Sequence, residues 1–487
     1  MRNQRLTGLG IDATYLTISK AITLCITMAT AMLLSRYRTV EEYGTYSQLL
    51  LATSICSAIF MMGLPGSINY FLARAESKEE EQKFLSAYYT LNTLLSFVTG
   101  AVLVLAVPLI ESYFRNPALK GFTYFLALYP WASIISSSIE NVLIVYSKTV
   151  FLMIYRLANS LFLLGSVLVI QLLGLGFREY MICYIAVYSL FAVSVYYIAS
   201  RLSGKIYFLF NRSLIKEILT FSLPLGLSSV VGTLSIEIDK LLIGRLMDTS
   251  QLAIYTNSAR ELPVTIVAAS VTAVLMPRLA KMLKEQRNRE AIELWGKATE
   301  LSLIFTAVVV FGVFVYAKEA LEILYSSKYL SGISVFRVYT LVLLLRITYF
   351  GIILNAIGKT KTIFYCSICS LILNAILNPL FYIAMGMIGP AIATFVSIAV
   401  MGIVQLILTS KHIEIAFSQI FPWKRCGIIL GVNAGLAIIF YAIKCYIPLE
   451  GLVGEIAESL ILGVIWTACY IIAMRKRIKI LWNELNL

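Results

Sequence analysis

Stretches of about 20 predominantly apolar residues recur along the whole of this chain, and each is long enough to cross the ~30 Å hydrocarbon core of a bilayer as a helix. Hydrophobic residues occupy 59% of the 487 positions and charged residues only 14%. Soluble domains carry nearer a quarter of charged residues and have no way to hide so much apolar surface. The sequence therefore predicts an all-α membrane protein that crosses the bilayer many times.

We predict fourteen transmembrane helices, arranged along the chain as two groups of six and a final pair. The predicted spans are 12–34, 45–72, 85–113, 120–146, 151–173 and 178–200, then 217–243, 252–278, 298–318, 333–357, 363–385 and 388–409, and last 425–447 and 453–474.

Basic residues are distributed unequally between the two sides that these spans define. Segments on the side of the N-terminus hold 25 Lys and Arg, and segments on the opposite side hold nine. Because cytoplasmic loops are enriched in Lys and Arg, both termini are predicted in the cytoplasm. The net charge of +14 is then a topology signal, and we expect no nucleic-acid partner.

Enzymatic chemistry has few residues to use. The chain has one histidine, His412, and three aspartates, Asp12, Asp239 and Asp248, so the Asp-x-Asp metal clamp of many glycosyltransferases is absent from the sequence. The predicted outer loops are also short. We therefore expect a transporter rather than an enzyme, with no cofactor and no metal site.

The two groups of six spans resemble each other. Matched residues lie at nearly constant offsets, of 209 positions for Arg36 with Arg245 and Tyr46 with Tyr255, and of 210 for Tyr155 with Tyr365 and Gly176 with Gly386. Repeats with an even number of spans enter the membrane in the same direction, as in transporters that bind their substrate between two halves. The predicted domains are an N-terminal lobe at 1–205, a C-terminal lobe at 206–411, and a final pair of spans with the C-terminal segment at 412–487.

Apart from bases at span ends that count with the loops, six basic residues fall inside predicted spans, where an ionisable group is costly unless it faces a hydrated cavity. Lys20 and Arg346 lie near the centres of their spans, too deep for their side chains to reach the headgroups easily. Arg156, Lys240 and Arg337 lie nearer span ends, where long side chains can reach the interface. Arg260 lies about 12 Å in from the outer face, beside Glu261, and is equally consistent with a cationic cavity and with pairing to that acid.

Four acidic residues accompany these bases: Glu140, Glu237, Asp239 and Glu261. Glu237 and Lys240 are three apart on a helix and can form an ion pair. The acids are also candidates for coupling to an ion gradient. These six bases against these four acids carry a net positive charge, which predicts a cavity that attracts an anion such as a phosphate or diphosphate.

Prolines inside or beside spans supply bends where helices flex. The predicted hinges are Pro65, Pro224, Pro263 and Pro379. Each is equally consistent with packing, and Pro224 and Pro263 are the two that flank the charged cluster.

Two segments resemble polysaccharide flippases of the multidrug/oligosaccharidyl-lipid/polysaccharide (MOP) superfamily, a group that includes the O-antigen flippases. They read IEIDKLLIGRLMDTSQLAIYTNSARELP, followed by LMPRLAK, and NAILNPLFYIAMGMIGPAIAT. The resemblance covers nearly the whole chain. Related lipid II flippases carry an arginine before a Glu-Phe-Pro in the eighth span; here the stretch is Arg260-Glu261-Leu262-Pro263, with the arginine about two residues nearer the proline.

The resemblance implies two six-helix lobes in a pseudo-two-fold arrangement, like that of multidrug transporters of the superfamily, plus two C-terminal helices. It further implies movement of an undecaprenyl-diphosphate-linked oligosaccharide (an O-antigen, capsule or exopolysaccharide repeat unit) from the cytoplasmic to the outer leaflet of the bacterial inner membrane by alternating access. The expected partners are that substrate, membrane lipids, a polysaccharide polymerase and a chain-length regulator. The C-terminal helices would offer an apolar groove for the polyprenyl tail.

Two other functions are compatible with parts of this pattern. A proton- or sodium-coupled multidrug antiporter of the same superfamily is the first, although such proteins usually have twelve spans and a deep acidic residue. A membrane-bound polymerase or glycosyltransferase is the second, and the short outer loops and the single histidine argue against it.

Overall fold

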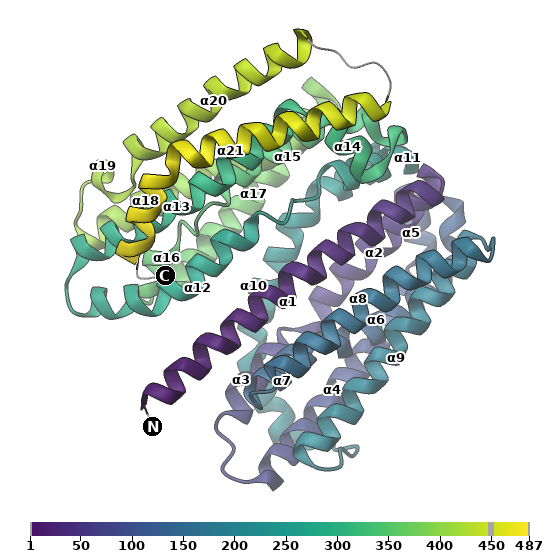
Figure 1. Ribbon diagram of the computed structural model, residues 1–487. Coiled ribbons are helices and arrows are strands. Elements are labelled where there is room, and N and C mark those ends of the chain that lie inside the picture. Colours follow the sequence, from purple (N-terminus) through teal and green to yellow (C-terminus); the bar gives the residue numbers. More distant parts are fainter. Residues whose placement is uncertain (1, 447–451, 486–487) are drawn as a thin grey trace. The chain divides into compact units, whose positions relative to one another are not determined.

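The computed structural model describes residues 2–446 and 452–485, and every regular element in these two stretches is a helix (Figure 1). The prediction of an all-α membrane fold is thereby confirmed. Contacts divide the chain into two compact units, Met1–Ile254 and Tyr255–Leu487. Each unit is described by itself.

Unit 1 contains the helices of the first predicted group of six spans and the first helix of the second group. Its elements are α1 (Arg2–Tyr37), α2 (Val40–Met61), α3 (Leu64–Leu72), α4 (Lys78–Leu105), α5 (Val107–Phe114), η1 (Pro117–Phe122), α6 (Thr123–Ser137), α7 (Ile139–Val145), α8 (Thr149–Leu172), α9 (Phe177–Ser203), α10 (Arg212–Leu246) and the start of α11 (Thr249–Ser258).

Unit 2 contains the rest of the second group and the C-terminal pair. Its elements after α11 are α12 (Thr265–Lys284), α13 (Asn288–Val315), α14 (Ala317–Tyr325), η2 (Ser327–Gly332), α15 (Ile333–Val342), η3 (Leu343–Leu345), α16 (Ile352–Ala356), α17 (Thr360–Met385), α18 (Ile388–Ile413), α19 (Phe417–Ile420), α20 (Trp423–Tyr446) and α21 (Leu452–Leu485).

Thirteen helical stretches of the described residues are long and apolar enough to cross a membrane. The segment predicted as the eighth span, 252–278, is instead divided between α11 and α12 by residues 259–264, which are not helical. The structure therefore supports a multi-pass membrane protein. The total of fourteen spans remains a prediction.

Helix boundaries repeat with the offset that the matched residues predicted. Equivalent elements begin 210 or 211 residues apart in the two halves of the chain. The pairs are α5 at Val107 with α14 at Ala317, η1 at Pro117 with η2 at Ser327, α8 at Thr149 with α17 at Thr360, and α9 at Phe177 with α18 at Ile388. In both halves a short helix and a 3-10 turn thus follow the third long helix at corresponding places.

The two compact units differ from the predicted lobes in the assignment of α10, which was predicted in the C-terminal lobe and belongs to unit 1. Residue 205 lies between α9 and α10, whereas the units divide inside α11. The backbone of α10 packs directly against the residue that ends α2. A Cβ built on Gly226 would lie 2.5 Å from the carbonyl carbon of Met62. Glycine at this position allows that close approach. The division into lobes remains a prediction.

Side-chain caps fix the start of several helices. Thr39 Oγ1 accepts the Glu42 N–H at 3.1 Å, and the Glu42 carboxylate accepts the Thr39 N–H at 3.0 Å, which completes a capping box on α2. Asn211 caps α10 by accepting the Leu214 N–H at 3.1 Å. These bonds satisfy backbone donors that a helix leaves unpaired at its first turn.

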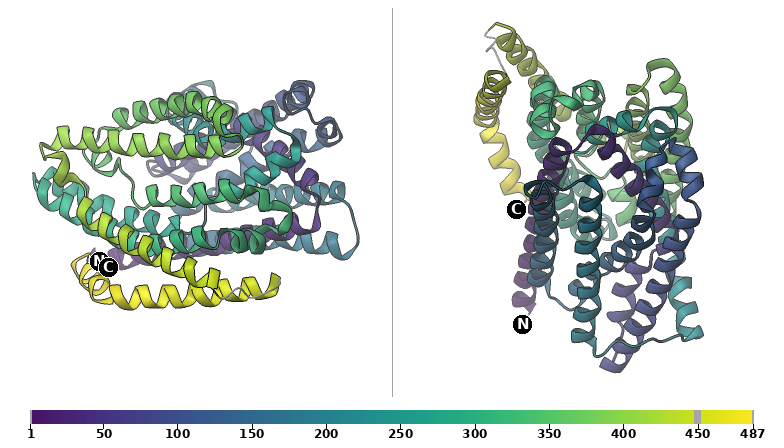
Figure 2. Two further views of the ribbon diagram at one scale, coloured as in Figure 1. Left: turned by 90° about the horizontal axis from the view of Figure 1, so that it is seen from above. Right: turned by 90° about the vertical axis from the view of Figure 1, so that its right-hand side faces the viewer.

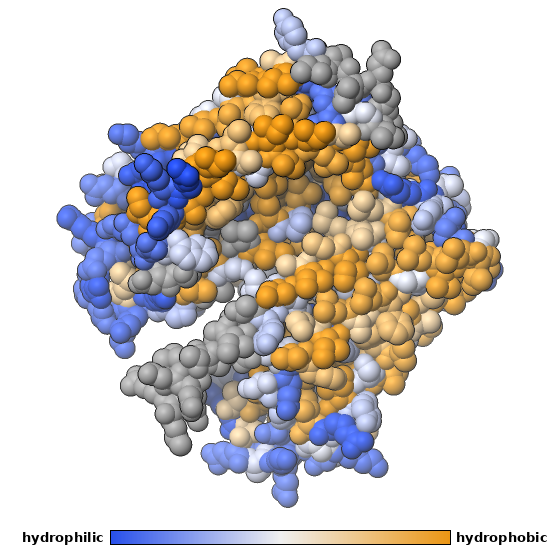
Figure 3. Space-filling view, viewed as in Figure 1, coloured by the Kyte–Doolittle hydropathy of each residue, from blue (hydrophilic) through white to orange (hydrophobic). Residues whose placement is uncertain are grey.

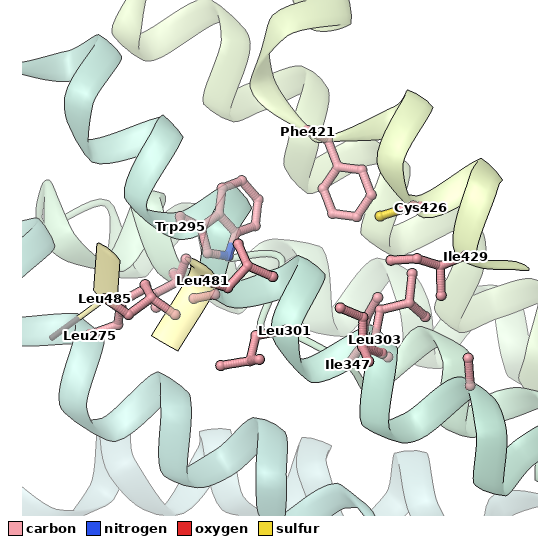
Figure 4. Close-up of a cluster of buried hydrophobic side chains, with 14 of the residues drawn as sticks. Leu275, Trp295, Leu301, Leu303, Ile347, Phe421, Cys426, Ile429, Leu481 and Leu485 are labelled. Carbon is pink, nitrogen blue, oxygen red and sulfur yellow. The ribbon is translucent and has the colours of Figure 1, made fainter. Parts of the chain in front are cut away.

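The core of unit 2 includes the C-terminal pair. α20 and α21 lie side by side and pack along α13 (Figure 2). Leu481 and Leu485 of α21 reach into the cluster beside Trp295 of α13 (Figure 4). Trp466 and Phe440 stack between α21 and α20 with ring centroids 5.1 Å apart. The pair is therefore part of the packed core of this unit.

Apolar side chains also cover the outside of the long helices. Leu172, Ile383 and Ile438 are among the most exposed hydrophobic residues of α8, α17 and α20. Within each unit, apolar residues cover the middle of the helices on the visible face, and hydrophilic residues gather at the helix ends (Figure 3). This pattern is expected of surfaces that face lipid tails in the middle and headgroups at the ends.

Candidate functional site

Three predicted site residues of unit 1 come together around one carboxylate. Lys20 Nζ of α1 lies 3.3 Å from Glu140 Oε1, and Arg156 Nη2 of α8 lies 2.5 Å from Glu140 Oε2. Each carboxylate oxygen therefore binds one base. We call Lys20, Glu140 and Arg156 the triad.

A helix break places the acid of the triad. α6 ends at Ser137 and α7 begins at Ile139, so that Glu140 lies in the first turn of α7. The hydroxyl of the intervening Ser138 donates to the Ile135 carbonyl at 2.7 Å and lies 3.1 Å from the Tyr89 hydroxyl of α4. The break is thus anchored to the core, and Glu140 meets two neighbouring helices.

The triad is partly open to its surroundings. The side chain of Lys20 is 58% exposed and that of Glu140 is 38% exposed, whereas that of Arg156 is 14% exposed. The Nη1 atom of Arg156 is buried and has no hydrogen-bond partner in the described part of the chain. Ionisable groups inside a span pair with one another or face a hydrated cavity, and the exposure of Lys20 is consistent with such a cavity. The triad carries one net positive charge.

Unit 2 brings together a second pair of predicted residues. Arg346 Nη2 lies 3.1 Å from Glu261 Oε1, and both side chains are more than a third exposed. Glu261 lies in the break between α11 and α12, and Arg346 follows η3 at the start of the irregular stretch 346–351. The ion pair therefore joins two interrupted spans.

Each break has a local cause or anchor. Pro263 has no N–H to donate to a helix and disfavours helical backbone at Leu262 before it. In the other break, the Trp295 indole N–H donates to Thr348 Oγ1 at 2.8 Å, and Ile347 is buried in the core of unit 2. These contacts hold the stretch after Arg346 against α13.

The predicted ion pair within α10 is confirmed. Lys240 Nζ lies 2.8 Å from Glu237 Oε2, one turn away on the same helix. Asp239 is buried, and its carboxylate accepts the backbone N–H of Lys240 at 2.8 Å. The lysine therefore balances one of the two carboxylates of this cluster.

The two remaining predicted bases lie elsewhere in unit 2. Arg260 occupies the α11–α12 break beside Glu261. Arg337 of α15 has its guanidinium carbon 5.7 Å from the ring centre of Phe314 on α13, a distance at which a cation is attracted to an aromatic face. A role for either in binding a substrate remains a prediction.

The predicted hinge prolines occupy different settings. Pro65 lies in the first turn of α3, two residues after Gly63, whose φ of +70° is accessible to glycine. Pro224 lies inside the continuous helix α10 and Pro379 inside α17, whereas Pro263 lies in the α11–α12 break. Flexing at any of them remains a prediction.

Two buried acids on the interface with the C-terminal pair were not anticipated from the sequence. Glu300 of α13 binds the guanidinium of Arg477 through two hydrogen bonds of 2.7 and 2.6 Å. Glu319 of α14 binds Lys444 of α20 at 2.5 Å, and both glutamates are at least 95% buried. Glu300 lies inside the predicted span 298–318, and an acid inside a span is the sequence signal that could have identified it.

The sequence as a whole matches a known family. Residues 33–334, more than half of the chain, match the family described as polysaccharide biosynthesis protein. The chain belongs to this family. The predicted resemblance to polysaccharide flippases is thereby confirmed at the level of the family, which points to a membrane transporter rather than an enzyme.

Two curated relatives match most of the chain. An uncharacterized membrane protein of Methanocaldococcus jannaschii is 26% identical over 420 residues, which cover 81% of this chain and 96% of that protein. The capsular polysaccharide biosynthesis protein CapF of Staphylococcus aureus is 22% identical over 395 residues, which cover 75% of this chain and 91% of that protein.

Solved structures of the MOP superfamily share the fold. The lipid II flippase MurJ in an inward closed conformation superposes with a TM-score of 0.76 at 18% identity, covering 95% of this chain and 99% of MurJ. An inward-facing multidrug transporter of the MATE family superposes with a TM-score of 0.61 at 17% identity, covering 80% and 94% of the two chains. The predicted fold of the superfamily is confirmed.

Proposed function

We propose that this protein is a flippase that moves a polyprenyl-diphosphate-linked oligosaccharide across the cytoplasmic membrane. The observation that carries the proposal is the triad, in which two bases from different helices converge on one acid inside the spans. A diphosphate needs cationic partners away from bulk water, and ammonium and guanidinium groups are suited to bind it. Membership of the polysaccharide biosynthesis family supports the saccharide part of the substrate.

Arg346 provides a second candidate contact for the anionic headgroup. Its guanidinium is 41% exposed and shares its ion pair with a carboxylate of similar exposure. Its position in a helix break resembles the interrupted helices that line substrate sites in other transporters. We assign the predicted substrate, undecaprenyl diphosphate carrying one repeat unit, on this basis and from the resemblance.

Movement would proceed by alternating access from the cytoplasmic to the outer leaflet. The excess of Lys and Arg on the side of the N-terminus supports cytoplasmic termini. The apolar outer faces of α20 and α21, with exposed residues such as Ile438 and Val464, support a path for the lipid tail along this pair. The similarity to a lipid II flippase and to a capsular polysaccharide protein is consistent with such a substrate.

Leaflet exchange in proteoliposomes tests the proposal. A fluorescent undecaprenyl-diphosphate oligosaccharide is reconstituted with the protein, and its exposure to an added glycosidase is followed over time. Protein-dependent exposure is expected, and Lys20→Gln should abolish it. Lys281→Gln removes an exposed base that forms a surface pair and serves as the matched control.

Two results would contradict the proposal. Exposure at the wild-type rate in Lys20→Gln would remove the triad from the substrate site. Absence of exposure with several saccharides, together with proton- or sodium-driven uptake of cationic dyes, would identify a multidrug antiporter instead.

A further inference from the structure

The two bases of the triad already bind an anion of the protein itself. Among the described residues, Glu140 is the ion-pair partner of both Lys20 and Arg156, and each of its oxygens contacts one base. Its carboxylate therefore stands where oxygens of a bound phosphate would bind. The arrangement holds the bases in place before a substrate arrives.

The contacts of Glu140 differ in how easily they are exchanged. The pair with Lys20 is longer, at 3.3 Å, and the lysine is more than half exposed. The pair with Arg156 is shorter, at 2.5 Å, and the arginine is mostly buried. Arg156 also keeps one buried guanidinium nitrogen, Nη1, without a partner. An incoming anion can thus take Lys20, the more exposed base with the longer contact, while Glu140 keeps its contact with Arg156.

We infer that Glu140 is a counter-ion which the substrate diphosphate displaces from Lys20, and which returns to Lys20 to release the diphosphate after translocation. The inference rests on the proposed function. Transport requires binding that is strong enough to load the site and weak enough to empty it. An internal acid that competes for the same bases lowers the affinity for the diphosphate and speeds its release. Glu140 acts through the two bases and is a positioning residue.

A counter-ion and a purely structural acid predict opposite changes in affinity for the diphosphate lipid when the charge of Glu140 is removed. Loss of the negative charge in Glu140→Gln should tighten binding of a diphosphate lipid by about two- to fivefold, because a partly exposed ion pair is worth up to ~1 kcal/mol. Flipping should become slower as release slows. Were Glu140 only holding the bases in position, its loss would weaken binding.

The test measures both quantities on the full-length protein. Binding of geranylgeranyl diphosphate is titrated in nanodiscs, and flipping of the undecaprenyl-linked probe is followed in proteoliposomes. Glu140→Asp, whose carboxylate is one methylene shorter, should give affinity between wild type and Glu140→Gln, and it carries the test if the glutamine variant does not fold. Glu179→Gln removes an acid of the same unit from the first turn of α9 and should match wild type.

The outcomes separate this inference from the proposed function. If the wild-type protein binds no diphosphate lipid and flips none, the proposed function fails. If wild type binds and flips but Glu140→Gln binds equally or more weakly, the counter-ion role is wrong. If Glu140→Gln binds more tightly but flips at the wild-type rate or faster, Glu140 has no role in releasing the diphosphate.

Discussion

Gly44 of α2 and Thr249 at the start of α11 touch through their backbones: a Cβ built on Gly44 would lie 2.1 Å from the carbonyl oxygen of Thr249. A chain of amide hydrogen bonds surrounds this contact. Asn116 Nδ2 donates to Thr45 Oγ1 at 3.0 Å and to Gln48 Oε1 at 2.7 Å, and Gln48 Nε2 donates to Thr249 Oγ1 at 3.2 Å. The beginning of the second repeat is thereby fixed to the first.

This contact predicts that Gly44→Ala destabilises the protein. The added methyl group requires the backbone of Thr249 to move, and overpacking of this kind costs about 1–3 kcal/mol. Thermal unfolding of the purified protein should show a lower midpoint. Gly165→Ala in α8 is the matched control, because a Cβ there meets nothing within 4 Å and alanine is the better helix former. Equal shifts for the two variants would contradict the prediction.

The pair of Arg346 and Glu261 predicts a difference between arginine and lysine. Arg346→Gln should abolish flipping while insertion and expression remain, because the charge that meets the diphosphate is lost. Arg346→Lys keeps the charge without the paired N–H donors of guanidinium and should retain part of the rate. Glycosidase exposure in proteoliposomes measures each rate. Wild-type flipping by Arg346→Gln would show that this arginine lies outside the substrate path.

The ion pair of Glu300 and Arg477 predicts strong coupling between α13 and α21. Arg477→Gln leaves the buried carboxylate of Glu300 without its cation, and breaking a buried pair in this way costs about 3–5 kcal/mol. The double variant Glu300→Leu with Arg477→Met should recover most of that loss, since apolar replacements of a buried pair are often neutral. Thermal unfolding of the wild type, both single variants and the double variant measures the coupling. If the stability lost in the double variant equals the sum of the losses in the two single variants, the two residues are not coupled.

Deletion from Arg425 onward acts on the same interface. It removes α20 and α21 and uncovers Trp295 and its neighbours in the core of unit 2. We expect lower stability together with impaired flipping of lipid-linked substrates. The ion-pair variants are therefore the sharper test of the C-terminal pair, because they leave its apolar outer face unchanged. Unchanged flipping after the deletion would reject the proposed path for the lipid tail.

The sequence predicted the helices well because apolar length and basic loops are local signals. The repeat was also visible, since matched residues 209 or 210 apart predicted the spacing of element boundaries such as those of η1 and η2. The Glu237–Lys240 pair followed from helical spacing alone. These features depend on short segments or on a fixed offset.

The helix breaks and the partners of the deep charges depend on tertiary contacts. Residues 252–278 contain Pro263 but read as one apolar span, and the break at 346–351 contains no proline at all. Lys20 and Glu140 are 120 positions apart, and no spacing rule connects them. Their meeting depends on how α1 and α8 pack beside α7, which the apolar pattern leaves undetermined.

Pro224 supplies a final prediction, concerning flexibility of α10. Because proline has no N–H, the helix lacks one backbone hydrogen bond at this point, and two residues later Gly226 packs directly on Met62. Pro224→Ala should stabilise the helix and slow flipping if bending here is part of the transport cycle. Pro277→Ala, at an exposed proline inside α12, should raise the unfolding midpoint without slowing transport. Wild-type flipping by Pro224→Ala, with a raised unfolding midpoint, would show that α10 moves without bending at this proline.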